Sequence, residues 1–354
     1  MTGFRTVRKV AHARASTSAP LASSSIGLSV QTGAGRGLEI LFDSPRQRPA
    51  GLERAAAADL AATAARLPEA LRGRLAVEAG EVLSLLHHED GEVPLFSRGY
   101  GLAICRGVVL GLRDAESKVP FESPWTGTLE VEEMDSSLPV VLAPSATLAL
   151  VSYALEVTGT HVATRSTAEI PGMTVLDTAA SPYPPQHHPF EEDGTPSPSR
   201  PLIEEGRWRN REEHAGDDVD PLFFLLTRPD RALRPLAAAT FFNRRNLAVG
   251  CSREVPGPSP AIVVDSWRVR VGPRSGRVPF EADLSWAGPG GERLAASATV
   301  TLQLDPWEVL SHVRGACGPV QPAIDVDPIE GDGHGEAPTL VTDLALADFA
   351  VPVT

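Results

Sequence analysis

The amino-acid sequence predicts an α+β protein: a smaller N-terminal α+β domain, followed by a mainly β C-terminal domain that contains a buried helix. Two observations lead to this class. Apolar and polar residues alternate strictly over 278–286 and again over 294–304, as in the two strands of a long hairpin. Over 52–71 and 145–158, apolar residues follow helical spacing or fill most of the run, which indicates helices that pack on such strands.

The N-terminal part opens with a predicted hairpin. Ile26–Val30 and Leu38–Phe42 have strand character and lie on either side of a glycine-rich turn. A dinucleotide-binding fingerprint would need a further glycine at the position of Leu38, and no ribose-binding acid in a strand-helix-strand unit follows. We therefore expect a turn here and not a nucleotide site.

Helices and further strands complete this part of the chain. The helical pattern is interrupted by Pro68, which should kink or split it, so we expect a pair of helices on a sheet. Residues 101–114 then read as strand, turn and strand. A connection rich in Pro, Gly and acidic residues, 123–137, suggests a domain boundary within it. We expect a domain over 1–135 and a β-rich domain over 136–354.

The helix predicted over 145–158 has clear ends. Pro144 and Ser145 are sound start signals, and Gly159 is a sound stop signal. Because its residues are apolar nearly all the way round, we expect this helix to be buried. A strand over Ala261–Val271 adds to the β content of the same domain.

The predicted hairpin over 278–304 should be buried on one face only. Its apolar residues form the expected core face, whereas Asp283 and Ser285 lie on the face expected to meet water. Directly after the hairpin, Asp305 can cap a short helix and Pro306 suits its first position. Glu308 stands where a capping box needs an acid.

Composition excludes several classes of protein. The formal net charge of -13 argues against a nucleic-acid reader, because affinity for phosphates comes mainly from clustered Lys and Arg. Cys105, Cys251 and Cys317 form no Cys-x-x-Cys pair and no even-numbered disulfide framework, so we expect a reducing cytoplasm. The longest apolar run, Val140–Leu155, falls short of the ~20 residues of a membrane span.

Nine histidines raise the question of a metal or acid–base site. Four of them lie in two local clusters, His87–Asp90 and His187–Asp193, and neither cluster has the spacing of a His-Glu-x-x-His zinc helix. The first lies in a polar turn. The second lies in a Pro-rich loop whose carboxylates could hold a cation, although adjacent carboxylates usually form a solvated face. Cys317 could act as a ligand or nucleophile, but a buried structural cysteine is the more frequent case.

The segment over 181–208 resembles one found in the TldD/TldE (PmbA-type) metalloprotease family. Phe190 to Gly194 keep an order of aromatic, acid, acid, acid and glycine, and Leu202–Glu204 followed by Gly206 keep a second block. The resemblance covers residue 138 to the end, and it implies that the N-terminal domain is shortened.

The chain departs from the TldD type at one helix. In TldD-type chains the helix that corresponds to 145–158 carries His-Glu-x-x-x-His, whose imidazoles bind zinc and whose carboxylate is the general base. Between Val140 and Thr160 this chain has no histidine, and Glu156 alone could not hold a metal. The helix resembles that of the TldE type, which pairs with TldD without supplying ligands. A cysteine resembling Cys317 completes the TldD zinc site, but Cys-Gly pairs also occur in TldE-type tails, so it stays only an alternative ligand.

The resemblance implies a non-catalytic TldE-like subunit of a heterodimeric zinc metallopeptidase or amide hydrolase. No cofactor is expected in this chain, because the TldD-like partner would supply the zinc, and the pair would act on peptides or peptide-derived natural products. The loop expected to face substrate or partner contains His187, His188, Phe190, Glu191, Glu192, Asp193 and Gly194. Two alternatives remain open: a self-contained metal hydrolase using His187 and His188 with nearby carboxylates, and a peptide-binding scaffold without chemistry.

Overall fold

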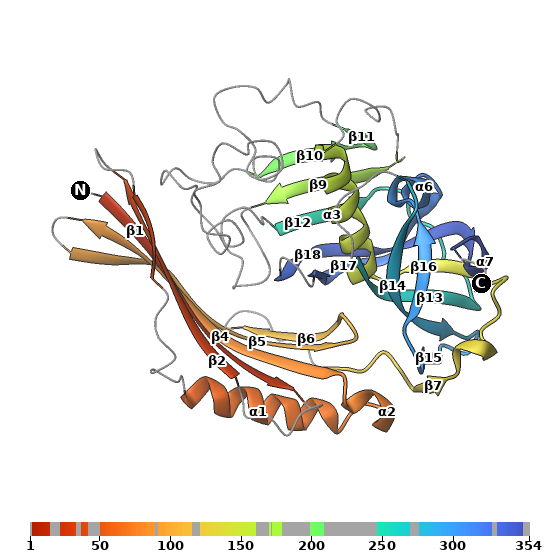
Figure 1. Cartoon of the computed structure of the whole chain (residues 1–354), viewed down its shortest axis with the longest axis horizontal. Coiled ribbons are helices and arrows are strands. Elements are labelled where there is room, and N and C mark those ends of the chain that lie inside the picture. The colour runs from red at the N-terminus through yellow and green to blue at the C-terminus, as the bar shows by residue number, and fades with distance from the viewer. Residues whose placement is uncertain are drawn as a thin grey trace. The chain divides into compact units, whose positions relative to one another are not determined.

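The computed structural model of the chain describes residues 2–14, 22–32, 37–41, 50–88, 91–114, 121–160, 170, 172–178, 199–208, 246–269, 276–327 and 331–349. Strands dominate these residues and helices are few, which confirms the predicted α+β class with a mainly β domain (Figure 1). The chain divides into two compact units. The first unit contains Met1–Pro124, and the second unit contains Trp125–Thr178 and Ser199–Thr354.

The six strands that the structure describes in the first unit form an antiparallel sheet in the order β3-β2-β1-β4-β5-β6. Their bounds are β1 Thr2–Arg14, β2 Ala22–Thr32, β3 Gly37–Leu41, β4 Leu75–His88, β5 Gly91–Cys105 and β6 Val108–Asp114. The hairpin predicted around the glycine-rich turn is confirmed, since β2 and β3 pair with Val30 opposite Leu38. The strand, turn and strand predicted over 101–114 are the end of β5 and β6.

Two helices accompany this sheet, α1 over Ala50–Ala64 and α2 over Glu69–Arg72. The split expected at Pro68 is confirmed, because Pro68 is the residue directly before α2. The most buried positions of α1 are Ala56, Asp59 and Thr63, whereas Leu60 is half-buried. The buried side of α1 is therefore rotated from the apolar stripe of the sequence, and it includes two polar side chains.

The second unit contains one sheet of twelve described strands, in the order β11-β10-β9-β12-β18-β8-β13-β14-β15-β7, with β16 beside β14 and β17 beside β18. Their bounds are β7 Gly127–Leu129, β8 Pro139–Leu142, β9 Met173–Thr178, β10 Arg200–Glu204, β11 Arg207–Trp208, β12 Asn246–Cys251, β13 Ala261–Val269, β14 Val278–Ala287, β15 Arg293–Ala296, β16 Val300–Leu304, β17 Val313–Asp327 and β18 Gly331–Ala345. Because β7 pairs with β15, the sheet includes residues that precede the boundary suggested near residue 135.

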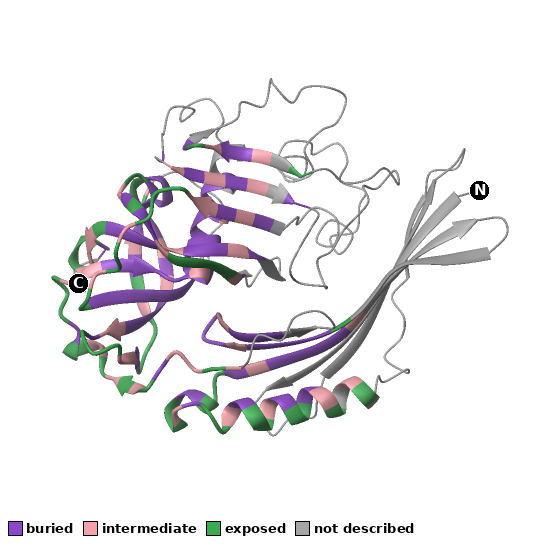
Figure 2. Ribbon diagram, turned by 180° about the vertical axis from the view of Figure 1, so that it is seen from behind, coloured by how far each residue is buried: buried purple, intermediate pink, exposed green. Residues whose placement is uncertain are grey.

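A long helix, α3 over Pro144–Thr160, lies in the core of the second unit. Every described side chain from Ser145 to Leu155 is buried except Ser152, which is half-buried (Figure 2). The prediction of a buried helix is thus confirmed. Apolar side chains from strands on several sides pack in the same core: Val140, Leu142, Met173, Val175, Ile203, Val249, Val264, Phe280, Leu304 and Leu340.

The hairpin predicted after residue 278 is confirmed, since β14 pairs antiparallel with both β15 and β16. The expectation that its second face meets water is wrong at Asp283 and Ser285, whose residues are 3% and 0% exposed. The side chain of Trp125 is buried against this face and donates a hydrogen bond to Ser285 Oγ. At Ser285 the covering residue is far away in the sequence, which a local pattern of alternation does not reveal.

Tight turns join two pairs of neighbouring strands. The β5–β6 turn consists of Arg106 and Gly107, with φ of 54° and 75°, and the β10–β11 turn consists of Glu205 and Gly206, with φ of 49° and 85°. Two positive φ values in a two-residue loop belong to the hairpin turn that matches strand twist. Glycine adopts the second of these conformations without steric cost.

The described part of the second unit also contains three short helices: η1 Val131–Glu133, α6 Pro306–Ser311 and α7 Leu346–Phe349. The cap predicted for α6 is confirmed, because Asp305 Oδ1 accepts a hydrogen bond from Trp307 N at 3.0 Å. The Glu308 side chain, expected to complete a capping box, instead accepts two hydrogen bonds from Arg277. The shorter of the two is 3.0 Å. Within the described residues, no helix is both long and apolar enough to cross a membrane.

Candidate functional site

The start of α3 is fixed by hydrogen bonds from the strands around it. Trp267 Nε1 of β13 donates to Ala146 O at 2.6 Å, and Ile324 N of β17 donates to Ser145 Oγ at 3.2 Å. Leu148 packs against Gly335 of β18, where a Cβ would lie 3.0 Å from a Leu148 methyl carbon. These contacts join the first turns of α3 to β13, β17 and β18.

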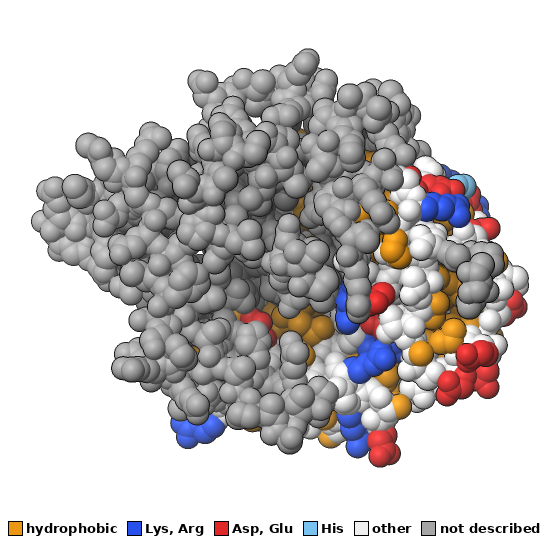
Figure 3. Space-filling view, viewed as in Figure 1, with side chains coloured by type: hydrophobic (Ala, Val, Ile, Leu, Met, Phe, Trp, Pro, Cys, Tyr) orange, Lys and Arg blue, Asp and Glu red, His pale blue; other side chains and the backbone are white. Residues whose placement is uncertain are grey.

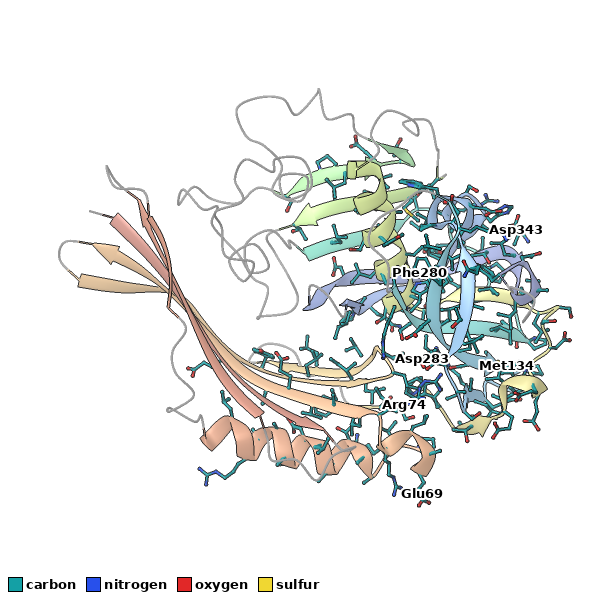
Figure 4. The ribbon with its side chains drawn as sticks, viewed as in Figure 1. Glu69, Arg74, Met134, Phe280, Asp283 and Asp343 are labelled. Atoms are coloured by element: carbon teal, nitrogen blue, oxygen red, sulfur yellow. The ribbon has the colours of Figure 1, made fainter. Side chains whose placement is uncertain are left out.

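The middle of α3 is held by aromatic packing. Tyr153 meets Phe280 of β14, labelled in Figure 4, with ring centroids 5.4 Å apart and ring planes inclined by 81°. Trp267 packs on the same Phe280 ring at 5.4 Å. The edge-to-face pair of Tyr153 and Phe280 adds to the stability that burial of the rings supplies.

The chemistry of this helix does not fit a zinc site. Its described side chains are hydrocarbon, hydroxyl and one phenol, and no histidine occurs between Val140 and Thr160. Catalytic zinc requires imidazole, thiolate or carboxylate ligands. The structure thus places α3 in the core, and its described surface offers no such ligand as far as Leu155.

The loop predicted from sequence, with His187, His188 and Phe190 to Gly194, lies outside the described residues. The structure does describe where it begins and ends. Thr178 at the end of β9 and Ser199 just before β10 approach each other, with their hydroxyl oxygens 2.9 Å apart. Arg200 lies opposite Asp177 in the antiparallel pair. The two ends of the candidate loop therefore emerge side by side from the sheet.

Neighbouring strands begin at the same end of this sheet. Asn246, the first residue of β12, pairs with Thr178, and Leu247 pairs with Gly335 near the start of β18. Since β12 and β18 run parallel, both strands begin at the same end of the sheet, next to Thr178. Thr178, Ser199, Asn246 and Gly335 therefore lie at the same end of the sheet of the second unit.

Cys317, the alternative ligand, lies in a different apolar cluster from α3. Its side chain packs with Val141 and Val263, whereas Val140 and Leu142, which alternate with Val141 along β8, belong to the core around the helix. Gly257 covers the thiol, and a Cβ on that glycine would lie 3.4 Å from Cys317 Sγ. Burial raises the pKa of the Cys317 thiol, which favours the protonated form. The structure does not bring Cys317 together with the buried surface of α3.

No group of three or more His, Cys, Asp or Glu side chains able to hold a metal occurs among the residues that the structure describes. One exposed pair has an acid–base geometry, since His312 Nδ1 lies 2.7 Å from Asp343 Oδ1. Both side chains are largely open to solvent, at 42% and 53% exposure. Such a pair is an ordinary surface contact.

Sequence reasoning missed a buried polar cluster in the second unit. Asp265 is fully buried and accepts hydrogen bonds from Ser285 Oγ, from an Arg293 guanidinium nitrogen and from Trp125 Nε1, the last at 3.2 Å. A β-bulge between Val264 and the residue after Asp265 leaves Asp265 without a partner in the register of β13 and β14. A single carboxyl in a run of apolar strand residues was the available signal in the sequence.

On the face drawn in Figure 3, the charges of the described residues do not locate a site. Acidic and basic side chains are interspersed among the described residues visible in Figure 3, on a chain whose formal net charge is -13. The candidate site is therefore defined by α3 and by the loop between β9 and β10, rather than by a patch of one sign.

Comparisons with known proteins test the architecture. The sequence matches no protein-family model, and no curated protein matches it. Among solved structures, TldE from Thermococcus kodakarensis aligns with a TM-score of 0.56 and 12% identity, covering 97% of this chain and 95% of that one. A proposed modulator of DNA gyrase from Thermotoga maritima gives 0.53 and 13%, with 97% and 94% coverage.

A third solved structure gives the same result. A proposed modulator of DNA gyrase from Bacteroides thetaiotaomicron aligns with a TM-score of 0.51 and 11% identity, covering 96% of this chain and 92% of that one. The likeness extends over nearly the whole length of each protein, and thus beyond the region after residue 138 that carries the sequence resemblance. On this evidence the chain has a TldE-like fold.

Proposed function

We propose that this chain is a non-catalytic, TldE-like subunit of a heterodimeric zinc metallopeptidase or amide hydrolase. A TldD-like partner supplies the zinc, and the pair acts on peptides or peptide-derived natural products. The observation that carries the proposal is α3: within a TldE-like fold, the helix that would hold the zinc ligands has no histidine and is packed in the core.

The contribution of this chain is then binding and not bond cleavage. A catalytic zinc site takes about three protein ligands and keeps one position open for water or substrate. The described surface of α3 offers hydrocarbon and hydroxyl groups, and Cys317 packs in a separate cluster. The loop with His187, His188 and Phe190 to Gly194 is the proposed contact with substrate or partner. Its two ends are held together where Thr178 meets Ser199.

The cytoplasm is the proposed compartment. Cys105, Cys251 and Cys317 are free thiols in the structure. Free thiols persist in a reducing environment, where both subunits of such a pair would meet.

The proposal is tested by an activity assay with three samples: this chain alone, a purified TldD-like protein from the same organism alone, and the two mixed. Hydrolysis of an unstructured peptide, followed by mass spectrometry, is expected in the mixture and at a far lower rate in either single sample. Size-exclusion chromatography of the mixture should show a 1:1 complex.

A matched control identifies the catalytic subunit. Replacing the zinc-binding histidines of the partner should abolish hydrolysis without preventing complex formation, whereas the His187→Ala and His188→Ala changes in this chain should leave zinc in place. Full activity of this chain alone would refute the proposal. A complex that forms but leaves the partner's turnover unchanged would favour a scaffold.

A further inference from the structure

The short strand β7 stands at the end of the strand order β14-β15-β7 in the second unit, and it runs parallel to β15. Hydrogen bonds join the two strands at both ends of β7. Thr126 N, just before β7, donates to Arg293 O at 2.8 Å, and Ser297 N donates to Leu129 O at 2.8 Å. The backbone amides of Thr126 and Ser297 therefore report whether each end of β7 is in place.

The residues of β7 bury little apolar surface of their own. Thr126 and Thr128 are exposed, Gly127 has no side chain, and Leu129 is half-buried. Trp125, directly before them, is 3% exposed, so it is the one buried side chain among residues 125–129. Because burial of apolar surface is the main favourable contribution to packing, the attachment of β7 to the sheet depends chiefly on Trp125.

Trp125 is held by polar groups of the strands beside β7. Its indole Nε1 donates to Ser285 Oγ of β14 at 2.8 Å and to Asp265 Oδ2 of β13 at 3.2 Å. Asp265 is fully buried and also accepts hydrogen bonds from Ser285 and from Arg293 of β15. A buried carboxylate needs such donors to compensate its lost hydration, so the site favours an indole over an apolar ring of similar size.

The far end of β7 is held more weakly. Ser297 Oγ donates to Glu130 Oε2 at 2.6 Å, and both residues are exposed. A hydrogen bond between exposed groups replaces bonds to water and adds little stability. The two ends of β7 thus differ, with a buried indole at one end and a solvated pair at the other.

We propose that residues 125–130 form a detachable edge strand, which leaves β15 and returns to it as one unit while β13 and β14 stay folded, with Trp125 as the residue that holds it. The edge of a sheet presents N–H and C=O groups that another strand can pair with. When β7 is in place it covers this edge of β15, and its departure uncovers the edge. The device uses contacts within the second unit and is independent of the proposed peptidase partner.

Hydrogen exchange of the full chain, resolved to single amides by nuclear magnetic resonance and repeated at several low urea concentrations, tests this device. The amides of Thr126 and Ser297 report on β7, and that of Ala143, which donates to Val264 O of β13 at 2.9 Å, is the reference in the core. Thr126 and Ser297 should share one degree of protection, at least about tenfold below that of Ala143. Their exchange should also depend less on urea, because a local opening exposes less surface than global unfolding.

Three variants separate the contributions to the attachment of β7. Trp125→Phe keeps an aromatic ring but removes the N–H donor, and Trp125→Ala removes both. The protection of Thr126 and Ser297 should fall from the parent to Trp125→Phe and again to Trp125→Ala, where it should drop about 100-fold or disappear. Thr128→Ala, at an exposed position of the same strand, is the matched control and should change both amides by at most about twofold.

Two results would overturn the proposal. If Thr126 and Ser297 exchange only as fast as Ala143 in the parent chain, β7 leaves the sheet only when the whole unit unfolds. If Trp125→Ala deprotects Thr126 but leaves Ser297 protected, residues 125–130 do not move as one unit. Circular dichroism shows whether each variant is folded. Should Trp125→Ala fail to fold, Trp125→Phe decides the question, since an equal loss of protection at both amides supports the device and a loss at Thr126 alone contradicts it.

Discussion

Tyr153 of α3 packs edge-on against Phe280 of β14, with the ring centroids 5.4 Å apart. Phe280 is fully buried, at 0% exposure, and its ring also packs against Trp267. Phe280→Ala should therefore lower the free energy of unfolding of the second unit by about 3–5 kcal/mol, because it removes buried area and leaves a cavity. Denaturation in urea with far-UV circular dichroism measures the loss.

A double-mutant cycle isolates the ring contact itself. Tyr153→Leu and Phe280→Leu, alone and together, should show a coupling of about 0.5–1.5 kcal/mol. Additive effects would mean that the two rings contribute only through burial. Thr301→Ala, at an exposed position of β16, is a control that should stay within about 0.5 kcal/mol of the parent.

The buried carboxylate of Asp265 should be more sensitive than an exposed one. Asp265→Asn removes the charge that faces Arg293 and disturbs the bonds from Trp125 and Ser285, so we expect a loss of about 3–5 kcal/mol. The matched control is Asp343→Asn, which breaks the exposed pair with His312 and should cost at most about 1 kcal/mol. Equal effects of the two changes would contradict this assignment.

The cap of α6 gives a smaller effect. Asp305→Ala removes the acceptor for Trp307 N, which should cost about 1 kcal/mol in thermal or urea unfolding. Glu308→Gln weakens a bidentate contact with Arg277 in which both side chains are about half exposed, so its cost should be smaller. A larger loss at Glu308 than at Asp305 would show that the ion pair, and not the cap, fixes this helix.

Cys317 should react slowly with iodoacetamide below its raised pKa. Burial disfavours the thiolate, so the pKa of this thiol lies above its ordinary value of 9.0. The alkylation rate of Cys317 should therefore keep rising with pH over a range in which the rate of a free thiol has already levelled off. By the same shift, the folded state holds the proton more tightly, so stability from this group is present below the unfolded pKa and is lost as pH rises through the folded one.

Mass spectrometry of tryptic peptides after alkylation at several pH values measures this rate. Glutathione in the same tube is the reference, and Cys105, which is fully buried and donates to Leu71 O, should not react in the folded chain. A rate for Cys317 that levels off at the pH where glutathione levels off would show that its pKa is not raised.

Local sequence patterns predicted the elements whose environment is set within a few residues. The apolar run with its start and stop signals predicted α3, and Pro68 predicted the break between α1 and α2. Strict alternation likewise predicted the β14 hairpin. In each case the signal and the structure that it specifies lie in the same stretch of chain.

Contacts between distant residues explain what the sequence did not reveal. Asp283 and Ser285 were expected to meet water because they alternate with core residues. Ser285 is instead covered by Trp125, which lies 160 residues away in the chain, and Asp283 accepts hydrogen bonds from Ser266 and Thr299. The bulge at Asp265 is equally invisible to a period-two pattern. In α1, Asp59 and Thr63 are buried because the sheet, and not the helix alone, decides which side faces inward.

The candidate site was predicted only in part. The absence of histidine from α3 is a property of the sequence, and the structure adds that this helix is packed in the core and that Cys317 lies in another cluster. The family resemblance pointed to the loop with His187 and His188, whose ends meet at Thr178 and Ser199. Its role stays a prediction, because sequence spacing does not determine how a loop folds.

The zinc content of the purified proteins shows which chain carries the metal. Inductively coupled plasma mass spectrometry should find no stoichiometric zinc in this chain alone and about one zinc in its complex with a TldD-like partner. The complex should keep that zinc after Cys317→Ala or His187→Ala in this chain. One zinc per isolated chain, lost on His187→Ala, would contradict the account and identify a self-contained metal hydrolase.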